Sequence, residues 1–483
     1  MKIPFIGQAY TSRSLNVNAQ RCVNLYPEAD ETGKSVLALY GTPGLTTKDT
    51  ATAASVVRGM YATPTKLYVA CGNKMYSYST SFVETEIGTL NTSTGVVKFA
   101  ENTTQVIAVD GTDGYIITKS SDAFAVVSDG DFTPLSPTTV TVLDSYFIVP
   151  DSGTQKFYIS SLDDGTAWDA LDFASAEGYA DNVVGLIADH RELWLMGEKT
   201  TEVWYNSGDS DFPFRRIDGA FIEYGCAASN SIAKMDNSVF WLGKSEYGQG
   251  VVLRATGYTP QRVSTHAIEY AIQGYATISD AIAFCYQQDG HSFYFLTFPT
   301  ANKTWCYDAA TGMWHERAYM TPGDGSLVRH RANCHAFFNG AHIVGDHTNG
   351  KIYELDPDVY ADAGDEIKSL RASPFVHDND NLALVQHHRF QVDIESGVGL
   401  VSGNGSDPQI ILRWSDDGGH SWSNEHYADV GSFAAVGSIG EYKKRAAWNR
   451  LGMSRHRIYE VSISDPVKRV MIGANLIATK GYR

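Results

Sequence analysis

The stretch SDDGGHSW, Ser415 to Trp422, gives the sharpest local motif in this chain of 483 residues. It fits the Asp-box pattern S-x-D-x-G-x-x-W at Ser415, Asp417, Gly419 and Trp422. In such a turn the Asp carboxylate accepts backbone N–H groups, the Gly allows the chain to reverse, and the aromatic ring packs beneath. A single box predicts a stabilised hairpin rather than a catalytic carboxylate.

Two pairs of adjacent carboxylates have the residue type that acid and base catalysis on a glycosidic bond requires. They are Asp163 with Asp164, and Asp416 with Asp417. Adjacent residues of a strand point to opposite faces, and both pairs lie in predicted turns. We therefore expect solvated turn residues.

Four histidines form two pairs of spacing five, His330 with His335 and His342 with His347. A zinc site needs ligands that converge, and Cys334 and Asp346 are close in sequence. However, a spacing of five puts the two members of a pair on opposite faces of a strand. We expect histidines in or beside strands, and no metal site.

No Gly-rich phosphate loop, nucleophile elbow or metalloprotease helix motif is present, so the sequence predicts no enzyme and no cofactor. The six cysteines contain no CxxC pair and are expected to be buried free thiols. No apolar run approaches the roughly 20 residues of a membrane span. The start MKIPFIGQAY lacks the long apolar core of a signal peptide. We expect a soluble protein without membrane insertion, made in a cytoplasm.

Basic residues gather at Lys443, Lys444 and Arg445, which could contact an acidic partner such as the propeller of another subunit; a solvated basic face is the alternative. The net charge is −17, of which residues 366–483 contribute +1 and the preceding part −18. An acidic body argues against a firm grip on nucleic acid, because phosphates must be neutralised by cations. It suits a surface that DNA passes without sticking, although ordinary solubility would explain it equally.

The elements that carry these residues follow a repeat. LWLMGEKTTEVWY, Leu193 to Tyr205, predicts a β-hairpin: an apolar arm, a polar turn with Gly197, and a second arm of strand formers. The pattern recurs, giving about seven copies spaced by about 39 to 53 residues, at Tyr68–Tyr78, Ile107–Ile117, Tyr146–Ile159, Val239–Leu253, Phe293–Tyr307 and His342–Leu355. This is the blade period of a β-propeller, and the sequence leaves six or seven blades open.

The predicted fold is all-β, in three parts. Residues 1–54 form an extended N-terminal arm, residues 55–365 the propeller, and residues 366–483 a β-sandwich-like domain or an elaborated last blade. Longer alternating strands are expected in the last part, at Phe390–Ser396, Gln409–Ser415, Arg457–Ser464 and Val470–Thr479. Within the propeller, Ser161–Gly178 predicts a surface loop with a short helical turn, and Thr265–Tyr275 a helix capped by Thr265.

Several stretches resemble the packaged-DNA stabilisation protein of short-tailed bacteriophages (podoviruses), the hub or nozzle of the tail. They are Asn16–Leu45, Lys156–Gly178, Glu192–Ile217 and Ile411–Ala474, so the resemblance covers most of the chain. It implies a virion protein without catalytic residues, cofactor or metal, assembled in the host cytoplasm after genome packaging. A homo-hexamer would add below the portal and its adaptor ring, extend the channel, retain the packaged DNA and attach a tail needle, fibre or spike. DNA would pass without sequence-specific binding.

Two other functions fit parts of the sequence. Sialidases carry several Asp boxes in a propeller, so a glycan-active, sialidase-like propeller or depolymerase of the virion is one alternative. A ligand-binding propeller of cellular origin is the other. Only one Asp box is present, and in sialidases the boxes are structural, which favours the tail protein.

Overall fold

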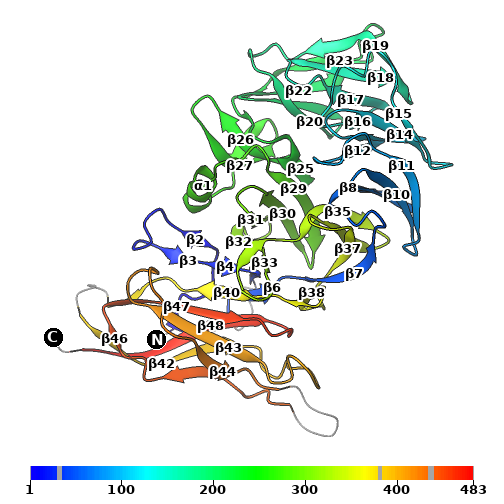
Figure 1. Ribbon diagram of the computed structural model, residues 1–483. Helices are drawn as coiled ribbons and strands as arrows, with labels where there is room; N and C mark the ends of the chain where they lie inside the picture. The colour runs from blue at the N-terminus through cyan, green and yellow to red at the C-terminus, as the bar shows by residue number, and fades with distance from the viewer. Residues whose placement is uncertain (1, 30–34, 379–382, 433–439, 482–483) are drawn as a thin grey trace.

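The computed structural model describes residues 2–29, 35–378, 383–432 and 440–481. In this part of the chain the structure is nearly all β, with one α-helix. Figure 1 shows a propeller, from blue through green to yellow, above a β-sandwich built from the two ends of the chain. The predicted all-β class, a propeller with a C-terminal β-sandwich, is confirmed.

Each of the seven predicted hairpins supplies the two middle strands of one antiparallel sheet. The first blade consists of β8 (Val57–Ala62), β9 (Lys66–Cys71), β10 (Lys74–Ser79) and β11 (Glu84–Thr89), and the second of β12 (Lys98–Glu101), β13 (Gln105–Val109), β14 (Gly114–Thr118) and β15 (Ala123–Val126). The third blade consists of β16 (Thr141–Leu143), β17 (Tyr146–Pro150), β18 (Lys156–Ser161) and β19 (Asp164–Ser175). The fourth consists of β20 (Val183–Asp189), β21 (Glu192–Gly197), β22 (Thr201–Asn206) and β23 (Phe214–Ile222).

The fifth blade consists of β25 (Ala233–Met235), β26 (Ser238–Ser245), β27 (Gly248–Thr256) and β28 (Thr259–Arg262), with β24 (Gly225–Cys226) beside β26. The sixth consists of β29 (Ile282–Gln288), β30 (His291–Phe298), β31 (Lys303–Asp308) and β32 (Met313–Glu316). The seventh consists of β35 (Ala332–Phe338), β36 (Ala341–Asp346), β37 (Lys351–Asp356) and β7 (Gly44–Thr50). In the described chain the propeller therefore has seven blades, one for each hairpin.

The ring is closed by the N-terminal part of the chain. Strand β7 pairs antiparallel with β37 and completes the last blade, so this blade joins residues from both ends of the propeller. The inner strand β35 of that blade contacts β8, the inner strand of the first blade. Closure protects sheet edges that would otherwise pair with other chains.

Aspartates at the turns between middle strands stabilise single blades. The Asp110 carboxylate accepts the backbone N–H groups of Thr112 and Asp113, at 3.0 and 2.8 Å, and the Tyr115 hydroxyl at 3.0 Å. Asp346 has the corresponding position in the last blade, where its carboxylate accepts a hydrogen bond from the Tyr353 hydroxyl at 2.7 Å. These contacts join residues that are close in sequence, so the turns of these two hairpins are stabilised by residues of the same hairpin.

The sandwich has two sheets. The first runs β45 (Ala446–Asn449), β42 (Val385–Ile394), β48 (Val470–Lys480), β6 (Leu37–Gly41) and β5 (Leu25–Ala29), with β1 (Lys2–Ile3) on β48 and β46 (Met453–Ser454) on β42. The second runs β4 (Cys22–Val23), β40 (Ser369–Ala372), β47 (His456–Ile463), β43 (Gln409–Ser415) and β44 (His426–Asp429), with β41 (Val376–His377) on β47. Pro27 lies in β5 at the end of its sheet, where a missing N–H is tolerated.

The predicted N-terminal arm, residues 1–54, is shared between the two domains. Besides closing the propeller through β7, it supplies β1, β4, β5 and β6 to the sandwich. Its Arg21 guanidinium lies 2.8 Å from Glu316 of the sixth blade. The buried Arg371 of β40 donates to the backbone carbonyls of Phe5 and Gln8, at 2.7 and 2.9 Å. The arm thus ties the sandwich to the propeller.

Two local predictions inside the propeller had different outcomes. Helix α1 (His266–Gln273) begins after Thr265, whose hydroxyl accepts the N–H of Ile268 at 3.4 Å, as predicted. The loop predicted over Ser161–Gly178 is wrong, because most of it forms strand β19 (Asp164–Ser175). Pairing with β18 and burial of Trp168 against Phe132 override the loop-like composition of small and acidic residues.

The shorter elements connect these parts. They are β2 (Tyr10–Thr11), β3 (Ala19–Gln20), β33 (Ala318–Met320), β34 (Leu327–Arg329), β38 (Ala361–Asp362), β39 (Asp365–Glu366) and the 3-10 helix η1 (Ser229–Ser231). Of the helices described, none has both the length and the apolar character to cross a membrane.

Candidate functional site: a cationic groove on the sandwich

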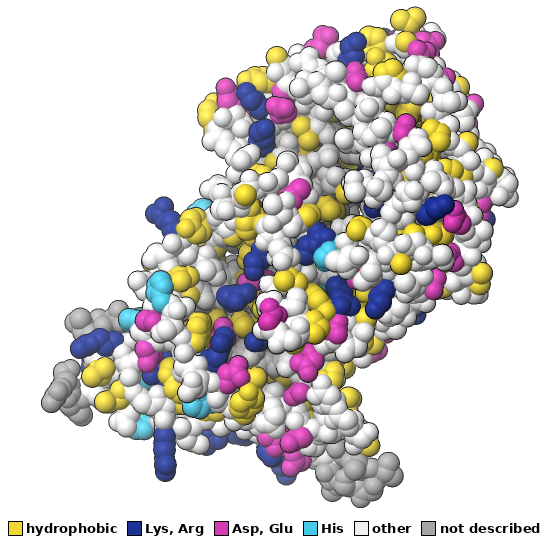
Figure 2. Space-filling view, viewed as in Figure 1, with side chains coloured by type: hydrophobic (Ala, Val, Ile, Leu, Met, Phe, Trp, Pro, Cys, Tyr) yellow, Lys and Arg dark blue, Asp and Glu magenta, His cyan; other side chains and the backbone are white. Residues whose placement is uncertain are grey.

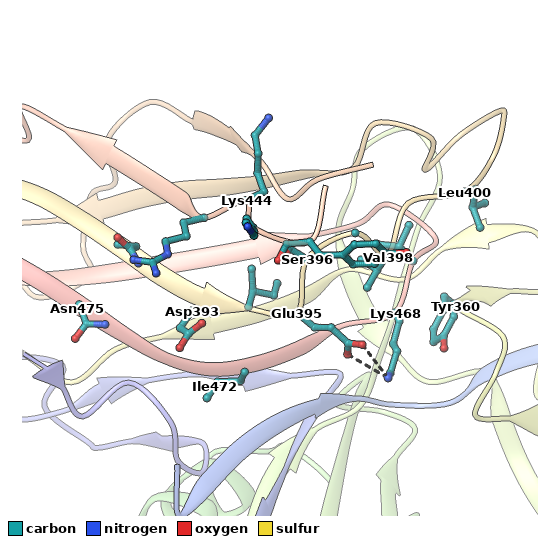
Figure 3. A pocket seen from close by; sticks show the side chains of 17 residues that line it. Tyr360, Asp393, Glu395, Ser396, Val398, Leu400, Lys444, Lys468, Ile472 and Asn475 are labelled. Atoms are coloured by element: carbon teal, nitrogen blue, oxygen red, sulfur yellow. Dashed lines mark hydrogen bonds and ion pairs between the residues drawn. The ribbon is translucent and has the colours of Figure 1, made fainter. Parts of the chain in front are cut away.

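A groove of about 1070 Å³ lies on the outer face of the first sandwich sheet (Figure 3). Strand alternation creates its floor, because Phe390 and Val392 of β42 point into the core while Gln391 and Asp393 face outward. The segment 442–445 and residues 467–468 form other parts of its wall.

The predicted contact residues Lys443, Lys444 and Arg445 are all exposed and lie together in this wall. Lys468, distant in sequence, lines the same groove. With Asp393 and Glu395 the groove presents four cations and two carboxylates.

Ion pairs already hold two of the cations. The Lys444 ammonium lies 2.6 Å from Asp429 and 3.7 Å from Glu441, and the hydrogen bond with Asp429 is the main cause that raises the pKa of Lys444. Lys468 lies 3.1 Å from Glu395. Lys443 and Arg445 make no ion pair within the part of the chain that the structure describes. Both side chains are exposed at the groove wall.

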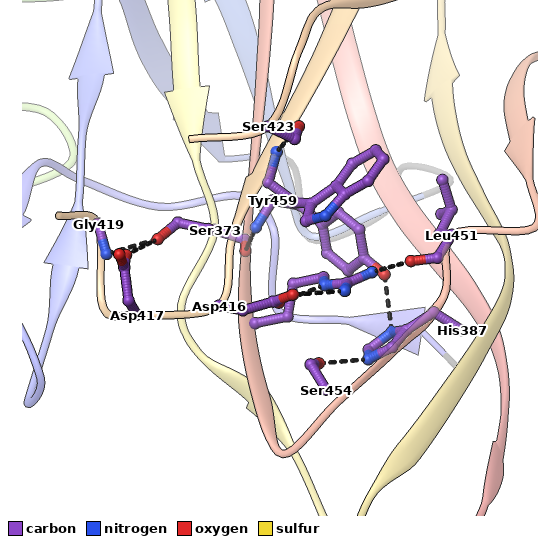
Figure 4. Close-up of polar contacts among 12 residues, drawn as sticks. Ser373, His387, Asp416, Asp417, Gly419, Ser423, Leu451, Ser454 and Tyr459 are labelled. Carbon is purple, nitrogen blue, oxygen red and sulfur yellow. Dashed lines mark hydrogen bonds and ion pairs between the residues drawn. The ribbon is translucent and has the colours of Figure 1, made fainter. Parts of the chain in front are cut away.

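The Asp-box residues form a hydrogen-bonded turn (Figure 4). The Ser415 hydroxyl donates to Asp417 at 2.7 Å, and the N–H groups of Ser421 and Gly419 donate to Asp417 and Ser415, at 2.9 and 2.8 Å. Hydrogen bonds, first the one from the Ser421 hydroxyl, hold the pKa of Asp417 well below its usual range. A carboxylate so fully engaged is poorly suited to proton transfer.

The same turn contacts the N-terminal arm. Trp422 packs with Leu15 and Ala19, and a Cβ atom on Gly418 would lie 2.3 Å from the Asn16 side chain. The Asp-box turn therefore also packs against the N-terminal arm and helps to join the two ends of the chain.

The other paired carboxylates are not set up for acid and base catalysis. Asp416 accepts two hydrogen bonds from the buried Arg457 guanidinium, at 2.6 and 2.7 Å (Figure 4). Asp163 lies in a turn with φ of 57°, and Asp164 accepts the Thr166 hydroxyl at 2.7 Å. Asp163, Asp416 and Asp417 lie in turns or bends, but the predicted turn position is wrong for Asp164, which begins strand β19.

The four histidines lie in or directly beside strands, as expected. His335 of β35 contacts His342 of β36, with Nε2 and Nδ1 3.1 Å apart. Burial lowers the pKa of His335 to about 3 and that of His347 to about 4, so both are neutral at pH 7. Among the described residues no group of three or more His, Cys, Asp or Glu side chains is placed to hold a metal ion.

The cysteines are free thiols. Four of the six are buried, and Cys285 and Cys334 are half-buried. Burial raises the pKa of Cys22 to about 12 and that of Cys226 to about 11, which keeps them protonated.

Sequence reasoning located Lys443, Lys444 and Arg445 but missed the rest of the groove. Alternation along β42 and β48 could have indicated that Asp393 and Asn475 face outward. That β42 and β48 are neighbours, with Lys468 beside them, depends on sheet topology and has no local signal.

The described chain combines a closed propeller with a β-sandwich that carries a charged groove. Family models identify the family of proteins to which this architecture belongs. Residues 1–360 match the family described as "Bacteriophage P22 Gp10, beta-propeller", and residues 369–478 match "Bacteriophage P22 Gp10, beta-sandwich". The chain belongs to the bacteriophage P22 Gp10 family and is a structural protein of the phage tail, located in the virion. The resemblance found in the sequence is confirmed.

Other comparisons add little. The extracellular domain of a two component system from B. thetaiotaomicron is 10% identical with a TM-score of 0.44, covering 65% of this chain. This chain spans only about 40% of that protein's length. The computationally designed Ika8 protein is 12% identical with a TM-score of 0.39, covering 74% of this chain and 98% of its own. At such values neither similarity indicates a function. A search of curated proteins gave no match.

Proposed function

We propose that this protein is the hub or nozzle of the tail, a homo-hexamer that adds below the portal and adaptor ring after DNA packaging in the host cytoplasm. In that position it extends the channel, retains the packaged DNA and provides attachment for a tail needle, fibre or spike. DNA passes through without sequence-specific binding. The observation that carries the proposal is the match of both domains to the P22 Gp10 family, and the cationic groove of the sandwich supports a contact surface between copies.

The partner we assign to the groove is the acidic propeller of the neighbouring copy. Residues before 366 carry a net charge of −18, whereas residues 366–483 carry +1. On the face drawn in Figure 2, acidic side chains are spread over the propeller among basic ones. Complementary charge speeds encounter and selects the register of an interface. Because the propeller ring is closed, we expect the sandwich and the N-terminal arm to supply one side of the lateral contact and the outer surface of the neighbouring propeller to supply the other.

Light scattering tests this proposal. The mass of the purified protein is measured alone and after mixing with a portal–adaptor complex. A ring of six copies, or a monomer that becomes six copies on the adaptor, is expected. A persistent monomer that never joins the complex would contradict the proposal, and a glycan-cleavage assay would then be the next experiment.

Charge reversal locates the contact. The triple variant Lys443→Glu, Lys444→Glu, Arg445→Glu should weaken assembly without unfolding the protein. As a matched control, Arg191→Glu, Arg215→Glu and Arg216→Glu change the net charge equally on exposed positions of the fourth blade. An unchanged oligomer mass for the groove variant, or an equal loss for the control, would remove the groove from the interface.

A further inference from the structure

The outer strand of the third blade carries a bulge that protrudes from the sheet. In β19, Trp168 pairs with Ser160 of β18 and Phe173 pairs with Tyr158, so four residues of β19 lie opposite Ile159 alone. Extra residues on one strand of a pair bend that strand out of the ladder. This β19 bulge consists of Asp169, Ala170, Leu171 and Asp172.

The β19 bulge presents an aliphatic side chain between two carboxylates. Leu171 is 81% exposed, and its backbone N–H donates to the Asp169 carboxylate at 2.9 Å, which stabilises the shape of the bulge. Burial, followed by the charges of Asp169 and Asp211, raises the pKa of Asp172. Carboxylates therefore repel one another at the bulge, and a cationic partner would relieve that repulsion.

The bulge lies in the most acidic part of the propeller. Residues 120–190, which include the whole third blade, contain twelve Asp and Glu residues and a single Lys, so they carry −11 of the net charge of −17. None of these twelve carboxylates is buried. The negative charge of the protein is thus concentrated around one blade instead of being spread evenly over the ring.

The sandwich groove has the complementary composition. The basic segment 443–445 is exposed in its wall, and the apolar side chains of Val398, Leu400 and Ile472 line the same groove. The groove can therefore cover a protruding leucine while its cations face the neighbouring carboxylates. An apolar anchor surrounded by complementary charges is the usual composition of a specific protein contact.

The bulge and the groove belong to opposite ends of the molecule. Figure 1 shows β18 and β19 at the end of the propeller that points away from the sandwich strands β42 and β48. The two surfaces therefore cannot meet within one chain, and a contact between them joins two copies head to tail. Repetition of a head-to-tail contact around an axis generates a closed ring.

We propose that the β19 bulge of one copy docks into the sandwich groove of the neighbouring copy, with Leu171 as the apolar anchor. Asp169 and Asp172 then lie opposite the basic segment 443–445. This inference rests on the proposed homo-hexamer, and it assigns the part of the acidic propeller that the groove binds. The contact is heterologous, so each copy uses its bulge toward one neighbour and its groove toward the other.

Charge exchange tests the docking, with assembly measured by light scattering of the protein alone and on the portal–adaptor complex. The bulge variant Asp169→Lys, Asp172→Lys should weaken the contact between copies by roughly tenfold or more, because ammonium groups then face the cations of the groove. The matched control Glu223→Lys, Glu246→Lys makes the same change of charge at exposed positions of other blades and should assemble like the wild type.

The combined variant gives the sharpest result. Adding Lys443→Glu, Lys444→Glu and Arg445→Glu to the bulge variant makes the two surfaces complementary again, so assembly should recover most of what either reversal alone removes.

Leu171→Ser tests the anchor without a change of charge. Because the side chain is exposed, the urea midpoint of the isolated protein should stay the same, whereas assembly should weaken several-fold. If the wild type forms six copies and the bulge variant assembles equally well, or if the combined variant recovers nothing, this inference is wrong while the proposed hexamer stands. A wild type that stays monomeric and never joins the adaptor would contradict the proposed function, and the docking of the bulge with it.

Discussion

The propeller and the sandwich are both made of antiparallel strands, but the contacts that stabilise them span very different lengths of chain. In the second blade, Asp110 and Tyr115 are five residues apart. In the sandwich, Arg371 binds the carbonyl of Phe5, which is 366 residues away. A blade can therefore form from one short segment, whereas the sandwich needs both ends of the chain before it can close.

The two domains also differ in what they leave exposed. The propeller closes on itself through β7. The sandwich presents a large open groove with exposed cations at Lys443 and Arg445. We propose that the propeller is a rigid unit and that the sandwich groove supplies the contact with the neighbouring copy, and each prediction below tests this division.

The largest effect is expected from Arg371→Met. The fully buried guanidinium donates to the carbonyls of Phe5, Gln8 and Arg21. Removing it leaves buried carbonyls unpaired and should lower the free energy of unfolding of the sandwich by about 4 kcal/mol. Hydrogen exchange should show faster exchange in β40, β42 and β48 with the blades still protected. Arg450→Met, at an exposed position of the same domain, is the control; a loss confined to the blades would contradict the division.

Acid should destabilise the sandwich through His387. Burial, and to a smaller extent the positive charge of Arg457, lowers the pKa of His387 to about 4. The His387 ring contacts the Tyr459 and Ser454 hydroxyls at 2.7 and 2.9 Å (Figure 4). The unfolded chain takes up this proton below about pH 6.5, so stability falls as the pH drops from 6.5 to 4, by about 3 kcal/mol. Urea unfolding at both pH values measures it.

Two histidine variants sharpen this measurement. His387→Gln should remove most of the difference in the free energy of unfolding of the sandwich between pH 6.5 and pH 4, because the side chain with the lowered pKa is then missing. His388→Gln, on the adjacent residue, should retain it. Equal pH dependence in wild type and His387→Gln would show that other groups cause the acid sensitivity.

Asp110→Ala should affect the propeller alone and by a smaller amount. The nearly buried carboxylate accepts two backbone N–H groups and the Tyr115 hydroxyl, so its loss should cost about 2 kcal/mol. Exchange should rise in β13 and β14 and stay unchanged in the sandwich. Thr112→Ala, in the same turn and exposed, serves as the control. A loss of sandwich protection would show that the two domains unfold together.

The smallest effect on stability is expected from the triple reversal at Lys443, Lys444 and Arg445. All three side chains are exposed, so the urea midpoint of the isolated protein should not change measurably, even though assembly weakens. A clear shift in the midpoint would mean that these residues stabilise the sandwich itself.

The range of the contacts also explains what could be predicted from the sequence. The seven hairpins, helix α1 and strand β43 follow from local alternation, turn residues and capping, and the structure has them within a few residues of the predicted positions. Strand β19 was missed because its Asp, Gly and Ala residues resemble a loop until Trp168 is buried by another segment.

Long-range features had no such signal. Nothing local shows that β7 completes the last blade or that β1 pairs with β48. For the same reason, the basic run at Lys443 was recognised, but not the groove it shares with Lys468 and Asp393.

Hydrogen exchange of the protein alone and bound to a portal–adaptor complex tests the division between the domains most directly. Assembly should protect residues 391–397 and 441–445 around the groove, while the inner strands β8, β12 and β16 exchange at the same rate in both states. Protection confined to the propeller, with the groove segments unchanged, would contradict the assignment of the sandwich as the contact domain.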